Sequence, residues 1–222
     1  MSETLKQSTS LNTRLAQTLS VILHPLLMPT ALFGMLFFLA PDRLNINTLS
    51  ESVRLNLLFL ITLLTFVVPA SLIFYLYKFG YVQSLKMETL QDRRLPYFCS
   101  AIIYAVGAYL LKYKFGNLSE MAPEIGVTLG GIALSILLVA IISLRWQISA
   151  HTVGIGGLVG VSMALLIKFG DLQLLYPTLG FLILAGYLAG ARLHLNAHTP
   201  AQIYAGFALG IVVSALTVYL AI

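Results

Sequence analysis

Apolar stretches of about 20 residues recur along the whole chain, and this repetition leaves little choice of fold. A bilayer core about 30 Å thick is crossed by roughly 20 helical residues. We therefore expect seven membrane helices, at about residues 19–40, 55–77, 97–115, 125–145, 152–169, 174–190 and 203–222. Only 9% of the residues are charged, against about 25% in a soluble domain. The pattern predicts an all-α, polytopic transmembrane bundle of six to seven spans.

The same apolar pattern excludes a water-soluble globule and a disordered chain. Because Cys99 is the single cysteine, a secreted disulfide scaffold is excluded as well. No connector is long enough to separate two domains. We expect a polar segment at residues 1–18 and one bundle over residues 19–222, in the cell membrane. The net charge of +5 is typical of contacts with lipid headgroups rather than nucleic acid. Four pairs of glycines spaced four residues apart, beginning at Gly126, Gly156, Gly186 and Gly206, predict close helix contacts in at least two pairs.

Polar and ionisable side chains gather in three clusters, at residues 86–96, 148–151 and 191–202. Two spans separate each cluster from the next, so all three return to the same face of the membrane. Ionisable groups at membrane depth cost about 2.5–3.5 kcal/mol each, which makes them candidates for function. We therefore expect these three distant segments to converge on one pocket. The orientation stays open, because the basic residues favour one face only when those of the clusters are counted.

The side chains in the clusters suit phosphate chemistry. Guanidinium and ammonium groups bind phosphate oxygens, and the cationic members are Lys86, Arg93 and Arg192. Ser149 places a hydroxyl just before a helix, whose backbone N–H groups favour an anion. Of the two histidines His151 and His198, one can attack phosphorus while the other protonates the leaving group. No pair of carboxylates is available for hydrolysis and no cysteine cluster for a metal, so phosphoryl transfer to water fits best.

These residues resemble the type 2 phosphatidic acid phosphatase superfamily, membrane lipid phosphatases related to vanadium haloperoxidases. Its signatures are K-x6-R-P, P-S-G-H and S-R-x5-H-x3-D. The chain has Lys86, six residues and Arg93; then Ile148-Ser149-Ala150-His151; then Ala191-Arg192, five residues, His198, three residues and Gln202. It departs from the signatures at Arg94, Ile148, Ala150, Ala191 and Gln202. The resemblance covers about residues 55–222.

The resemblance implies a residue-by-residue assignment of roles. His198 would be the nucleophile that forms a phosphohistidine, and His151 the acid that protonates the leaving oxygen. Gln202 would occupy the position of the Asp that orients the nucleophile. The phosphate would be held by Lys86, Arg93, Ser149 and Arg192. The implied substrate is a lipid phosphate or isoprenoid diphosphate, with no cofactor and no metal.

Each of these residues also has a simpler interpretation. Thr199-Pro200-Ala201-Gln202 has the pattern of a capping box, in which Gln202 bonds the backbone of Thr199 and says nothing about catalysis. Lys86, Arg93 and Arg94 are also typical of juxtamembrane charge, and His151 of a histidine at a helix start.

Two further histidines and two rival functions complete the alternatives. His194, four residues before His198, could form a metal pair with it, but four histidines in the chain are few for a metal centre. His24 is assigned a structural or interfacial role. The rival functions are a non-catalytic relative that binds a lipid phosphate or a partner helix, and a small anion transporter.

Overall fold

The computed structural model describes residues 11–85, 87 and 89–221, and these residues form helices joined by short connectors, with no strand among them. The elements are α1 (Leu11–Ile22), η1 (Pro25–Leu27), α2 (Met28–Leu39), η2 (Pro41–Leu44), α3 (Glu51–Thr62), η3 (Leu63–Val67), α4 (Val68–Lys78), α5 (Leu90–Tyr113), α6 (Asn117–Met121), α7 (Pro123–Ile142), α8 (Ala150–Phe169), η4 (Leu172–Leu174), α9 (Leu175–His194) and α10 (Pro200–Ala221). Within the described residues, seven helical segments are long and apolar enough to cross a membrane. The predicted fold class is confirmed.

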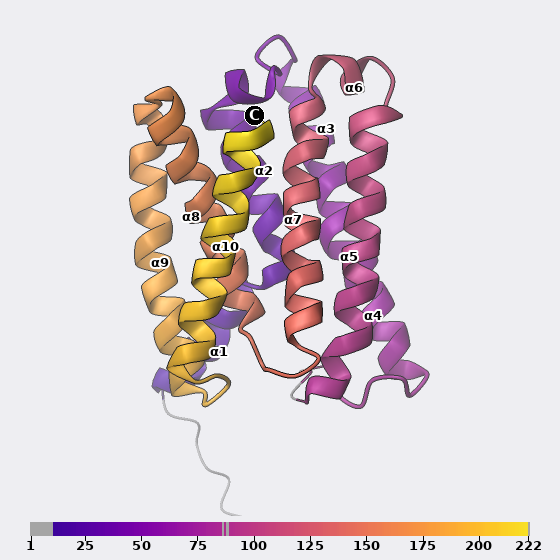
Figure 1. Cartoon of the computed structure of the whole chain (residues 1–222), viewed down its shortest axis with the longest axis vertical. Coiled ribbons are helices and arrows are strands. Elements are labelled where there is room, and N and C mark those ends of the chain that lie inside the picture. Colours follow the sequence, from indigo (N-terminus) through magenta and orange to yellow (C-terminus); the bar gives the residue numbers. More distant parts are fainter. Residues whose placement is uncertain (1–10, 86, 88, 222) are drawn as a thin grey trace, which may run out of the picture.

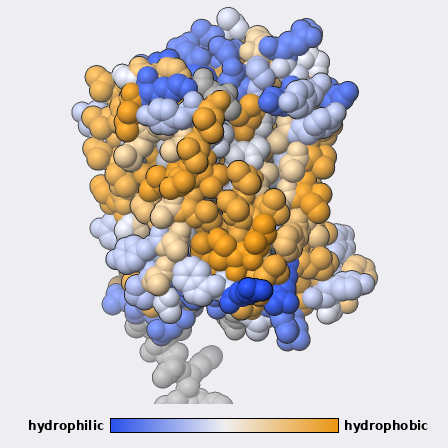
Figure 2. Space-filling model, in the orientation of Figure 1, coloured by the Kyte–Doolittle hydropathy of each residue, from blue (hydrophilic) through white to orange (hydrophobic). Residues whose placement is uncertain are grey.

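The spans alternate in direction, so the connectors gather at two ends. The connectors between α4 and α5, α7 and α8, and α9 and α10 lie at the lower end in Figure 1, together with the start of α1. Those that contain η2, α6 and η4 lie at the upper end. Figure 2 shows a broad apolar band between two polar ends, as expected of a multi-pass membrane protein. The clusters at 148–151 and 191–202 therefore share the lower end with the start of α5.

Two spans begin earlier than the hydropathy pattern predicts. The first starts at Leu11 rather than near residue 19, because α1 is an amphipathic helix that packs along α9. The third starts at Leu90 rather than near residue 97, because Thr89 caps it. The Asp92 N–H donates to Thr89 Oγ1 at 3.1 Å, and that hydroxyl donates to the Asp92 carboxylate at 2.8 Å. Residues 90–96 of the first charged cluster thus form the first turns of α5, which continues past Pro96.

A proline explains the irregular middle of the second span. Pro69 has no N–H to donate to the carbonyl of Thr65, four residues earlier. The backbone forms one π-helical turn, η3, just before this proline. The Thr65 carbonyl instead accepts a hydrogen bond from the hydroxyl of Tyr104 on α5. Tyr104 is fully buried. Every backbone acceptor in a membrane needs a donor, and here α5 supplies it to η3.

Two of the four predicted glycine pairs lie where α8 and α10 are in close contact. A Cβ on Gly156 would lie 2.5 Å from the Phe207 carbonyl oxygen, and one on Gly160 would lie 2.7 Å from that of Ile211. Facing them, a Cβ on Gly206 would lie 2.7 Å from the Ser149 carbonyl oxygen. Two of the four predicted pairs therefore form one interlocked contact. Gly186 and Gly190 on α9, by contrast, have no atom within 4 Å of such a Cβ.

This difference yields a test of the packing. We expect Gly210→Ala to lower the free energy of unfolding by about 1–3 kcal/mol, because its Cβ would collide with the Val153 carbonyl and lie 2.8 Å from the Gly157 nitrogen. Gly186→Ala is the matched control and should be neutral, or stabilising by up to about 1 kcal/mol through helix propensity. Thermal unfolding of the two variants in the same detergent measures both. Equal shifts would contradict the interlocked contact.

Candidate active site

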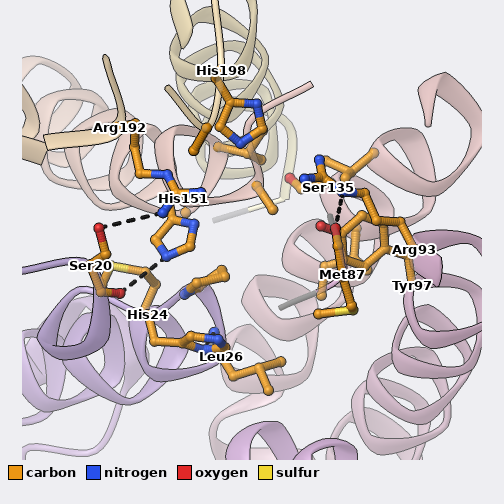
Figure 3. A pocket seen from close by; sticks show the side chains of 18 of the residues that line it. Ser20, His24, Leu26, Met87, Arg93, Tyr97, Ser135, His151, Arg192 and His198 are labelled. Atoms are coloured by element: carbon orange, nitrogen blue, oxygen red, sulfur yellow. Dashed lines mark hydrogen bonds between the residues drawn. The ribbon is translucent and has the colours of Figure 1, made fainter. Parts of the chain in front are cut away.

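One large cavity, of about 1310 Å³, opens among the helices and receives most of the predicted site residues. Arg93, His151, Arg192, His198 and Gln202 all line it. In Figure 3, Arg93, Tyr97 and Met87 lie across the cavity from Ser20, His24 and His151. The three distant segments therefore converge on one pocket, as predicted. The residues for which this is confirmed are Arg93, His151, Arg192, His198 and Gln202.

The two other predicted phosphate ligands are Lys86 and Ser149. Lys86 lies outside the described residues. Ser149 is fully buried and does not line the cavity. Its hydroxyl accepts the Thr152 N–H at 3.5 Å, and its carbonyl accepts the Thr152 hydroxyl at 3.0 Å. The Ser149 side chain therefore serves as the N-cap of α8, and we leave it out of the phosphate site.

The cations of the cavity have no carboxylate partner among the described residues, where the ion pair found is Arg43–Asp171 at 3.2 Å. The Arg93 Nε donates to the Met87 carbonyl at 2.7 Å, and Arg93 is 6% exposed. The Nε of Arg192 is buried and has no hydrogen-bond partner in the described part of the chain. A buried donor without an acceptor is costly. The unpaired donor of Arg192 and the second guanidinium group, that of Arg93, line one cavity and favour an anion there.

The ends of several helices add to the positive potential of the cavity. The helices α5, α8 and α10 all begin at the lower end, and the N-terminus of a helix carries a partial positive charge. Arg192 lies in the last turn of α9, where the opposite partial charge stabilises a cation. The lower end of the cavity is therefore electropositive from backbone and side chains together.

The proton on His198 can be assigned from its neighbours. The Gln202 Oε1 accepts the Thr199 backbone N–H at 3.0 Å, which identifies it as the oxygen of the amide. The same oxygen lies 3.3 Å from His198 Nδ1, and the Gln147 carbonyl oxygen lies 3.2 Å from it. Both neighbours are acceptors, so Nδ1 carries the proton. The Nε2 of His198 is left with its lone pair.

Gln202 thus has both of the roles considered for it. The Gln202 N–H donates to Thr199 Oγ1 at 3.4 Å, which with the Thr199 N–H bond completes the predicted capping box at the start of α10. The amide oxygen that closes this box is also the one that accepts from His198. The cap and the orienting contact are therefore a single arrangement.

Burial and positive charge keep His198 neutral. His198 is 8% exposed, and burial, followed by the charges of Arg93 and Arg192, lowers the pKa of His198 from 6.5 to about 4. Its bonds to Gln202 and Gln147 oppose this shift only in part. The imidazole is consequently a free base across the neutral and mildly acidic range.

This shift makes the stability dependent on pH. The unfolded chain takes up a proton at His198 as the pH falls through 6.5, whereas the folded protein does so only near pH 4. Between these values the unfolded state binds more protons, so the free energy of unfolding falls with falling pH, by at most roughly 3 kcal/mol. We expect the wild type to lose more stability between pH 7.5 and 5 than His198→Gln, measured by denaturation in detergent. Parallel losses would contradict the shift.

The remaining histidines have different surroundings. His194 is exposed, and its Nε2 lies 3.1 Å from the Thr13 hydroxyl, outside the cavity. His24 lines the cavity, with its ring centroid 5.7 Å from that of His151 in an edge-to-face contact. Among the described residues, no group of three histidine, cysteine or acidic side chains gathers as metal ligands.

Sequence reasoning missed Ser20 and His24 as members of the site. Ser20 acts partly through its backbone carbonyl, which no side-chain pattern reveals. The available signal was Pro25, which interrupts an otherwise apolar span immediately after a histidine.

No family model, curated protein or solved structure matches this chain. The fold and cavity define a multi-pass helical membrane protein with an electropositive site at one end. Its resemblance to the lipid phosphatase superfamily stays a prediction from motif spacing.

Proposed function

We propose that this protein is an integral membrane phosphatase, in the cell membrane, that hydrolyses a lipid phosphate or isoprenoid diphosphate through a phosphohistidine. The observation that carries the proposal is the meeting of two guanidinium groups, Arg93 and Arg192, with a histidine whose Nε2 lone pair is free. The guanidinium groups neutralise the phosphate oxygens, and the neutral imidazole supplies the nucleophile.

The proposed reaction has two steps. His198 Nε2 attacks phosphorus, the bond from phosphorus to the leaving oxygen breaks, and that oxygen takes a proton from His151. Water then attacks phosphorus and gives a proton to His151, which passes it to the phosphate as the N–P bond breaks, so inorganic phosphate leaves and both histidines are restored. Gln202 and the Gln147 carbonyl hold the Nδ1 proton of His198 throughout, which keeps the attacking nitrogen unprotonated.

The shape of the cavity supports an amphiphilic substrate. Above the charged end, the walls are formed by apolar residues of α2, α7 and α8, among them Leu32, Ile132 and Leu158. Leu158 lies seven residues above His151 on α8, which at about 1.5 Å per residue is roughly 10 Å into the bundle. An anionic head and an apolar chain would each meet matching walls.

The rival functions fit less well. A transporter needs access from both ends, but none of the residues that line the cavity comes from the η2, α6 or η4 connectors. A non-catalytic phosphate-binding relative shares every contact with the proposed enzyme and differs only in turnover. The neutral amide of Gln202 is the feature that favours this second candidate.

Vanadate offers the most direct test, because it imitates the transition state of phosphoryl transfer and such mimics bind far more tightly than substrate. Purified protein is assayed for phosphate release from phosphatidate, isoprenyl diphosphates and alkyl phosphates of increasing chain length. We expect turnover that improves with chain length, competitive inhibition by vanadate, and no inhibition by chelators.

Two neighbouring arginines provide the matched pair for this test. Arg93→Gln should raise the inhibition constant of vanadate by roughly 10–100-fold, because a hydrogen bond to a charged group contributes about 1.5–3 kcal/mol. Arg94→Gln should leave it unchanged, since Arg94 is exposed and donates to the Leu144 carbonyl at 3.1 Å. Vanadate binding without turnover would favour the non-catalytic relative, and inhibition by chelators would contradict the metal-free reaction.

A further inference from the structure

The first span lies outside the residues that resemble the superfamily, yet it supplies Ser20 and His24 to the cavity. We propose that the broken turn between α1 and η1 is a positioning device, in which Ser20 holds His151 and Arg192 in their working orientations. This inference rests on the proposed function for its chemistry, but its geometry stands on separate contacts. Figure 3 shows Ser20 bonded to both residues.

The break begins at Pro25, which has no N–H. In a continuous helix, that N–H would satisfy the carbonyl of Val21. Here the His24 N–H takes its place, donating to the Val21 carbonyl at 3.3 Å. His24 is thereby withdrawn from its own helical acceptor, the carbonyl of Ser20. One missing donor therefore leaves the Ser20 carbonyl free of helical bonds.

The free carbonyl receives a donor from another span. His151 Nε2 lies 3.1 Å from the Ser20 oxygen, and since a carbonyl only accepts, Nε2 carries the proton. Nδ1 is then the nitrogen of His151 that exchanges a proton with substrate. When His151 protonates the leaving oxygen from Nδ1, the ring keeps the Nε2 proton and returns to its neutral form. Since the neutral ring carries its proton on Nε2, the proton that Nδ1 delivers is first taken from the P–OH group of a singly protonated phosphate substrate.

The Ser20 side chain orients the second residue. Its hydroxyl hydrogen is donated to the Ala16 carbonyl at 2.9 Å, so only its lone pairs face outward. One of them accepts from Arg192 Nη1 at 3.4 Å. This contact fixes one end of the Arg192 guanidinium. The buried Nε has no hydrogen-bond partner among the described residues and is therefore available to bind the anion. A single residue of α1 thus sets the direction of both groups.

The experiment repairs the break. Pro25→Ala restores the missing N–H, so we expect the helical bonds to close and the Ser20 carbonyl to return to His24. The thermal stability should be kept or raised, which separates this effect from unfolding. His151 should change from one Nε2–H tautomer to a mixture, visible in ¹⁵N spectra of histidine-labelled protein and assigned with His151→Asn. The kcat should fall roughly tenfold or more, as a misplaced general acid requires, with a smaller change in KM.

Two controls accompany it. Pro69→Ala also restores an N–H within a span but lies away from the cavity, so it should leave the His151 signal unchanged. Ser20→Ala should raise KM for a phosphate substrate several-fold through Arg192, whereas Ser162→Ala, which loses an equivalent bond to the carbonyl four residues earlier, should not.

The two proposals fail in different ways. A changed His151 tautomer in a protein that turns over none of the substrates would support the positioning and overturn the proposed function. An unchanged tautomer in Pro25→Ala would overturn the positioning, whatever the activity. An unchanged KM in Ser20→Ala would overturn the role of Ser20 toward Arg192.

Discussion

His198→Ala is expected to lower phosphate release by about 10³-fold or more, because a methyl group cannot form the phosphohistidine. The variant should stay folded and monodisperse in detergent and should still bind vanadate, since Arg93 and Arg192 are unaltered. Phosphate release from the panel of lipid phosphates measures the loss. Trapping of an acid-labile phosphoprotein in the wild type, but not in the variant, identifies the intermediate directly.

His194→Ala is the internal control for this result. His194 lies four residues before His198 in the sequence, but its side chain is outside the cavity and is hydrogen-bonded to Thr13 at the surface. Activity of His194→Ala should stay close to that of the wild type. Residual activity of His198→Ala within tenfold of wild type would contradict the nucleophile assignment.

The second large effect is a gain. Gln202→Glu should raise the rate of phosphate release by roughly 10–100-fold, because a carboxylate can keep both hydrogen bonds of the amide oxygen and adds a negative charge beside the imidazole. A positive charge develops on the imidazole ring of His198 as its Nε2 bonds to phosphorus, and the neutral amide of Gln202 does not offset it. A carboxylate in the first turn of α10 also suits the helix dipole. Steady-state kinetics at pH 7 measures the gain, and the pKa of His198 should rise from its value of about 4.

A matched variant separates this effect from helix capping. Thr199→Ala removes the hydroxyl that accepts the Gln202 N–H, but it leaves the contact of Gln202 with His198. It should cost about 1 kcal/mol of stability with little change in kcat. If Gln202→Glu and Gln202→Asp both leave the rate unchanged while the wild type is active, Gln202 is a cap only. If the wild type and both variants are inactive, the non-catalytic relative replaces the enzyme.

The sequence predicts the spans and the convergence of the site for simple physical reasons. Each span must bury a run of apolar residues, and each pair of spans returns the chain to one face, so His151 and Arg192 meet without any detail of packing. The capping box at Thr199 is equally local, because it depends on residues three apart. These features are set by short-range chemistry and by the thickness of a bilayer.

The parts that escaped prediction depend on contacts between distant backbones. A serine just before a helix suits both an N-cap and an anion ligand, so the sequence near Ser149 does not decide between these roles. The role of Ser20 arises from a carbonyl released by Pro25 and reached by a residue 131 positions later. Which glycine pair interlocks also depends on the packing of α8 against α10, since Gly186 and Gly190 have the same spacing and no close neighbour.

Connectors of the lower end of the bundle line the cavity, and those of the upper end do not. This asymmetry decides which leaflet of the bilayer the site can serve. A headgroup that enters at one end must leave as phosphate at the same end. Under the proposed function, a protein inserted in one orientation therefore dephosphorylates lipids of a single leaflet. Lipids of the other leaflet become substrates only after they have crossed the membrane, so the supply of substrate depends on flipping.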